Sequence, residues 1–143
     1  MRVSPVIDHI KADKAIGYIS YGGAREYRAL RAVPAALPAA FVIPLSRTTE
    51  SLPRTGVMAQ VSKISFAVVT ILAEKRAGAV KGIDELDSIE RALIDRLNGW
   101  HHPDGATPVF ATGGQDISAE LGAFAWATTF SFTSTTRKAI SHG

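Results

Sequence analysis

The segment that most constrains the fold is a long run of alternating side chains near the carboxyl end of the chain. Its even positions carry large, mostly aromatic side chains: Phe124, Trp126, Thr128, Phe130 and Phe132. Its odd positions carry small or hydroxylated side chains: Ala123, Ala125, Ala127, Thr129, Ser131, Thr133 and Thr135. Because successive side chains of a strand point to opposite faces of its sheet, the pattern predicts a strand whose aromatic face packs on helices. The other face is expected to be open to solvent or to another protein.

A second pattern predicts an amphipathic helix ahead of this strand. Apolar side chains recur there at three- and four-residue steps: Leu86, Ile89, Leu93 and Leu97. Gly99 fits the left-handed position that ends a helix, and Trp100 is expected to fold back onto Ile94. We therefore expect the core to be anchored by eight side chains: Leu86, Leu93, Leu97, Trp100, Phe124, Trp126, Phe130 and Phe132.

The other elements are predicted from shorter signals. Helices are expected over residues 4–14 and 24–33, a short apolar segment over 16–21, and strands over 39–45, 57–73, 109–117 and 123–135. Residues 34–38 form a Pro-containing connector, residues 47–56 a polar loop, and residues 136–143 a mobile tail of a single domain. A phase change near 62–63 predicts a bulge. We predict an α+β fold with a four-stranded, largely antiparallel sheet, a hairpin at its end, and helices mainly on one face.

Composition excludes several classes of function. The chain has no cysteine among its 143 residues, which excludes disulfides, thiolate catalysis and cysteine-based zinc sites. No apolar run approaches the ~20 residues of a membrane helix, and the first residues lack the apolar core of a signal peptide. The formal net charge of +3 comes from scattered lysines and arginines, so no specific nucleic-acid binding is expected.

The motifs that could carry chemistry have simpler explanations. His101, His102 and Asp104 are close in sequence, but neighbouring residues rarely bind one metal ion together, and no third ligand has a suitable spacing. Residues 112–115 (TGGQ) lack the Gly-Lys-Ser/Thr sequence of a phosphate-binding loop and favour a kink in a strand. The hydroxyl run over 128–136 reflects strand propensity, since no base accompanies it. We expect no cofactor, no metal and no enzymatic activity.

Several of these segments resemble a known family. The sequences PAAFVIPL at 38–45, FAVVTIL at 66–72, LNGWHHPDG at 97–105 and FAWATTFSF at 124–132 are similar to those of tail terminator proteins of long-tailed bacteriophages. The similarity covers about residues 3–138 and rests on packing residues and one Gly-Trp pair. The resemblance implies a virion protein, assembled in the host cytoplasm. It also implies a hexameric ring on the head-proximal end of the tail tube, which stops polymerisation and presents a surface for head joining.

The resemblance also implies partners: further copies of the chain, the tail tube protein and a head-completion or connector protein. Polar and charged residues in loops are the candidates for these contacts: Arg47, Glu50, Arg54, Lys75, Arg76, His101 and His102. Two alternatives stay open at this point. One is a head–tail connector or neck protein of similar size, and the other is a small cytoplasmic enzyme or ligand-binding domain.

Overall fold

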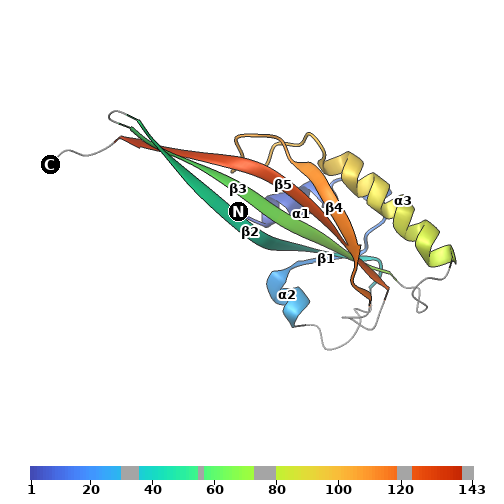
Figure 1. Ribbon diagram of the computed structural model, residues 1–143. Helices are drawn as coiled ribbons and strands as arrows, with labels where there is room; N and C mark the ends of the chain where they lie inside the picture. The colour runs from blue at the N-terminus through green and yellow to red at the C-terminus, as the bar shows by residue number, and fades with distance from the viewer. Residues whose placement is uncertain (30–35, 55–56, 73–79, 119–123, 140–143) are drawn as a thin grey trace.

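The computed structural model describes residues 1–29, 36–54, 57–72, 80–118 and 124–139 (Figure 1). Its elements, in chain order, are α1 (Ser4–Lys11), a 3-10 helix η1 (Lys14–Ile16), β1 (Ser20–Gly23), α2 (Ala24–Arg28), β2 (Ala39–Arg54), β3 (Val57–Ile71), α3 (Val80–Leu97), β4 (Phe110–Asp116) and β5 (Ala125–Ala139).

The sheet has five strands in the order β1-β2-β3-β5-β4. β1 pairs with β2 in parallel, and the other three pairs are antiparallel. The expected α+β class, the largely antiparallel sheet and the pairing of the last two strands are confirmed. The expected number of four strands is wrong. β1 was missed because it has only four residues, two of them glycines, which are depleted in strands.

The main core lies between the sheet and helices α1 and α3. Val6 and Ile10 of α1 are fully buried, and so are Leu93 and Leu97 of α3. They pack on the even-numbered side chains of the central strands: Phe66, Val68, Phe130 and Phe132. Of the eight expected anchors, Trp100 and Trp126 are only partly buried, whereas the other six are buried.

The opposite face of the sheet is not fully open. Ala39, Phe41, Val69, Ile71 and Ala125 form a second, smaller apolar cluster there. Tyr27 of α2 packs on Phe41 with ring centroids 5.8 Å apart, so α2 lies on this second face while α1 and α3 lie on the first. The expected open face of the last strand is therefore covered in part, with Ala125 and Ser131 both only 2% exposed.

Two expectations about irregular segments are wrong. The predicted polar loop at 47–56 continues β2 as far as Arg54, paired with β3 through every residue. The predicted tail at 136–143 continues β5 as far as Ala139, and residues 140–143 lie outside the described part. In both segments β3 supplies backbone partners, which side-chain polarity does not exclude. The register shift lies between Pro44 and Ser46 of β2, rather than near 62–63 of β3.

The end of α3 follows the sequence pattern closely. Gly99 has a positive φ of 82°, the left-handed conformation that favours glycine. The ring of Trp100 then stacks on His9 of α1, with centroids 4.4 Å apart. His9 also accepts a bond at its backbone oxygen from Arg96 Nε, at 2.9 Å. These contacts join the last turn of α3 to α1.

Candidate protein–protein interface

The molecule has a three-stranded arm that extends beyond its helices. β2, β3 and β5 continue together away from α3, toward one end of the molecule (Figure 1). We define the arm as residues 46–54, 57–63 and 133–139, which pair throughout. It lies at the end of the molecule opposite α3, and no described helix covers its tip.

Where the side chains of the arm are described, hydroxyl groups link neighbouring strands. Thr49 Oγ1 and Ser62 Oγ lie 3.0 Å apart on neighbouring strands. At the base of the arm, Thr133 Oγ1 donates to Thr107 Oγ1 over 3.0 Å, and its backbone N–H donates to the same oxygen over 2.8 Å. Such bonds align the strands but bury little apolar area, and none of the arm's described side chains belongs to either apolar core cluster.

The sheet leaves long edges without a strand partner in the part of the chain that the structure describes. β1 pairs with β2 only from Ala39 to Val42, so the rest of β2 has a free edge. β4 pairs on one side with β5, and all its residues except Ala111 are exposed. Phe110, the first residue of β4, is 50% exposed. Free edges of this length are sites where another chain can add.

The predicted contact residues fall in different places. Arg47 and Glu50 are exposed on β2 and pair with Ile64 and Val61, which are three residues apart, so they lie on opposite faces of the arm. Arg54 ends β2. Lys75 and Arg76 lie outside the described residues.

The two adjacent histidines differ, which corrects the expectation of a polar exposed pair. His101 is exposed, but His102 is only 1% exposed and stacks on Phe132 with centroids 5.0 Å apart. The backbone N–H of Asp104 donates to His102 Nδ1 over 2.9 Å, which makes Nδ1 an acceptor. His102 Nε2 therefore carries the proton and donates to the backbone oxygen of Arg2 over 2.7 Å. His102 fastens the amino terminus to the core and is no surface contact, a role that the sequence does not signal.

An ion pair completes this attachment. Arg2 Nη2 lies 2.8 Å from Asp104 Oδ1, and the backbone N–H of Arg2 donates to Asp104 Oδ2 over 3.1 Å. These hydrogen bonds from Arg2 lower the pKa of Asp104 to about 2. The loop 101–109 and the amino terminus thus form one unit at the base of the arm, where Met1 and Arg47 line the same shallow hollow.

The opposite end of the molecule holds a pocket of about 370 Å³ between α3 and the sheet. Its apolar wall is formed by Ile83, Leu86, Phe124 and Trp126, and its polar groups are the carboxylates of Asp87, Glu90 and Asp116. Glu90 Oε2 accepts a bond from Thr128 Oγ1 at 3.0 Å. Asp116 accepts the hydroxyl and backbone N–H of Ser118, which lowers the pKa of its carboxyl.

Trp126 shapes the wall of this pocket. Its indole Nε1 is buried and, among the described residues, has no hydrogen-bond partner. A Cβ added at Gly114 of β4 would lie 2.7 Å from this nitrogen, so the indole packs directly over the glycine. The TGGQ segment at 112–115 therefore has a packing role, together with the register shift between Ala111 and Gly113.

The described residues give no sign of metal binding or of a membrane span. Within them, no group of three or more His, Asp or Glu side chains is placed to hold a metal ion. None of the helices in this part of the chain is both long enough and apolar enough to span a bilayer.

One solved structure, a chain of the "Virion of native gene transfer agent (GTA) particle", is 16% identical with a TM-score of 0.48, covering 93% of this chain and 92% of that one. No curated protein matches the sequence. The family model for the phage tail terminator protein matches residues 1–141. This family consists of structural phage proteins rather than enzymes, and because the match covers nearly the whole chain, the protein belongs to the phage tail terminator family.

Proposed function

We propose that this protein forms a hexameric ring on the head-proximal end of the phage tail tube, stops tube polymerisation there, and presents the surface to which the head joins. The family supports a role in the tail. The observation that carries the proposal further is the arm, a sheet extension whose described side chains belong to neither core cluster. Strands that bury little apolar area within their own chain are suited to bury it against another.

The mechanism is geometric. Heterologous contacts between identical subunits generate a ring when their rotation closes, and an open helix when it does not. One face of the ring matches the tube subunit, and the other differs enough that no further tube subunit adds. The partners are therefore further copies of the chain, the tail tube protein and a head-completion protein. Capping of this kind needs neither cofactor nor catalysis, and assembly takes place in the host cytoplasm.

Electron microscopy of negatively stained samples tests the proposal. The purified protein is imaged alone and after mixing with tail tube subunits, and lysates of a phage deleted for this protein are imaged alongside. We expect rings on tube ends in the mixture and over-long tubes in the deletion. Tubes of normal length that fail to join heads would instead indicate a connector or neck protein. Normal tubes that join heads normally would contradict any role in termination.

A further inference from the structure

The two ends of the molecule carry opposite charge. The arm contains five basic residues, Arg47, Arg54, Lys63, Arg137 and Lys138, against the single acidic residue Glu50. Helix α3, at the other end, contains five acidic residues against three basic ones. Of the arm cations, Arg47 and Lys63 are exposed. This separation is hidden in the whole-chain charge of +3, because the two ends partly cancel.

The pocket beside α3 places three carboxylates next to an apolar wall. Asp87 forms a surface ion pair with Arg91 at 2.9 Å. Glu90 and Asp116 accept hydrogen bonds from hydroxyl groups, and in the described part of the chain neither carboxylate pairs with a cation. Among the described residues, the pocket therefore offers two carboxylates without a cation partner next to the side chains of Phe124 and Trp126.

We infer that this pocket receives a basic side chain from the arm of a second copy of the chain. A long basic side chain matches it in two ways. Its methylene stem packs on apolar and aromatic surface, and its charged head bonds the carboxylates at the rim. Because the arm is basic and the pocket is acidic, the occupant that fits the pocket is the arm of a further copy of this chain. The inference rests on the proposed ring and names the contact that joins its subunits.

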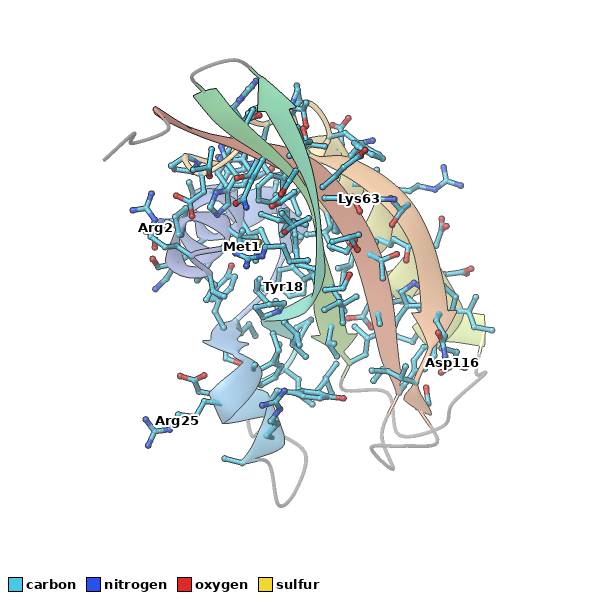
Figure 2. The ribbon with its side chains drawn as sticks, turned by 60° about the vertical axis from the view of Figure 1, so that its left-hand side comes forward. Met1, Arg2, Tyr18, Arg25, Lys63 and Asp116 are labelled. Carbon is cyan, nitrogen blue, oxygen red and sulfur yellow. The ribbon has the colours of Figure 1, made fainter. Side chains whose placement is uncertain are left out.

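The arm of one molecule cannot fill its own pocket. Lys63 pairs with Thr133 of β5, and Asp116 pairs with Trp126 of the same strand. These positions are seven residues apart on β5, so about 23 Å separates them along the strand. Lys63 and Asp116 accordingly lie toward opposite ends of the sheet (Figure 2). Each molecule must donate its arm to one neighbour and accept an arm from another, which is the head-to-tail arrangement that closes into rings.

Charge reversal on each surface tests the contact. The arm variant carries Arg47→Glu and Lys63→Glu, one change on each face of the arm, so that either docking face loses a cation. The pocket variant carries Asp87→Lys and Glu90→Lys. Each variant alone is expected to lower the number of rings on tube ends by about tenfold or more, because every subunit contact then repels. A pocket variant with Glu90→Gln keeps an acceptor for Thr128, in case Glu90→Lys impairs folding.

Mixing the two variants is the decisive measurement. In an alternating ring, the native arm of each pocket variant meets the native pocket of an arm variant. The reversed arm of each arm variant meets the reversed pocket of a pocket variant. Rings in which the two variants alternate should form in the equimolar mixture, and also from one chain that carries all four changes. Mass spectrometry of such rings should show equal numbers of the two chains. Failure of both the mixture and the fourfold variant to assemble, with thermal melts showing folded subunits, would overturn the proposed contact.

Matched controls separate this outcome from a failure of the proposed function. Lys14→Glu and Asp95→Lys reverse exposed charges outside the arm and the pocket, and should leave ring formation unchanged. If the controls reduced ring formation as much as the arm and pocket variants do, net charge would be the cause. The proposed contact would then be overturned. If the wild type forms no rings on tubes at all, the proposed function fails rather than the contact.

Discussion

The same three strands run through two regions of very different chemistry. Within the body, Phe66 of β3 stacks on Phe130 and meets Phe132 edge-on, with centroids 5.4 Å and 6.3 Å apart. A few residues further along, in the arm, the side chains of β5 are small and hydroxylated, as at Ser134 and Thr136, whereas β3 mixes apolar residues such as Val61 with polar ones such as Ser62. β2 and β5 become mainly polar in sequence where α1 and α3 no longer cover them, whereas β3 keeps several apolar residues. The length of these strands therefore exceeds what the core requires, which is the ground for the proposal that the arm serves contacts with other chains.

The two regions also differ in what stabilises them. A fully buried aromatic or aliphatic side chain contributes about 1.5–3 kcal/mol through removal of apolar surface from water. A hydrogen bond between strands contributes a net of about 0.5–1.5 kcal/mol. The contacts between described side chains of the arm are of the second kind, and so we expect its stability to depend on the body to which β2, β3 and β5 anchor it.

The largest effect is expected from removal of an aromatic side chain in the body. Phe132→Ala should lower the free energy of unfolding by about 3–5 kcal/mol, because Phe132 is fully buried and packs on both Phe66 and His102. Thr136→Ala is the matched control, on the same face of β5 but in the arm, and should cost less than about 0.5 kcal/mol. Chemical denaturation measures both. Equal costs would break the distinction between body and arm.

The next effect comes from the close contact beside the pocket. Gly114→Ala should cost about 1–3 kcal/mol, because its Cβ would meet the Trp126 indole nitrogen at 2.7 Å. Gly113→Ala is the control: its Cβ would lie 3.4 Å from Thr129 Oγ1, an ordinary contact. A Trp126→Phe background should recover part of the Gly114→Ala cost, since it removes the nitrogen. Additive costs in the double variant would show that the indole is not the obstacle.

A smaller, pH-dependent effect is expected where the amino terminus meets the loop 101–109. The pKa of Asp104 is about 2, below its unfolded value, so this carboxylate stabilises the folded state above about pH 4. The stabilisation is lost as the pH falls from about 4 toward 2. Asp104→Asn should therefore flatten the fall in melting temperature across this window. A variant as acid-sensitive as the wild type would show that the Arg2–Asp104 pair does not contribute.

The smallest effect on folding is expected in the arm itself. Arg47→Glu with Lys63→Glu should change the free energy of unfolding by less than about 0.5 kcal/mol, because both side chains are exposed. The same variant should strongly reduce ring formation. A large loss of stability would mean that the arm charges support the fold, and the contrast between the two regions would need revision.

Elements with a strong internal period could be predicted from the sequence. The apolar stripe of α3 and the aromatic alternation of β5 both place their side chains on the helix-covered face, where Trp126 is half-buried. Elements without such a period were missed or misread. The second half of β2 reads as a loop because it is polar on both faces, and β1 reads as no strand because it is short and rich in glycine.

The candidate site was less predictable than the fold. Sequence position suggested that His101 and His102 are equivalent, whereas backbone groups of Arg2 and Asp104 select His102 for burial. Arg47 and Glu50 of the predicted loop do lie on the surface, but on opposite faces of a strand. The pocket combines residues from α3, β4 and β5 with Phe124, which directly precedes β5, so no local pattern could reveal it.

The sequence by itself determined the two amphipathic faces of this protein, because hydrophobic periodicity is a local property that each segment carries alone. It also determined the absence of cysteine chemistry and the resemblance to a family. Only the tertiary structure decided how far β2 and β5 extend, where the arm lies relative to the acidic pocket, and which histidine is buried. Those features depend on pairing partners that are distant in sequence, and backbone hydrogen bonds can join them whatever the polarity of their side chains.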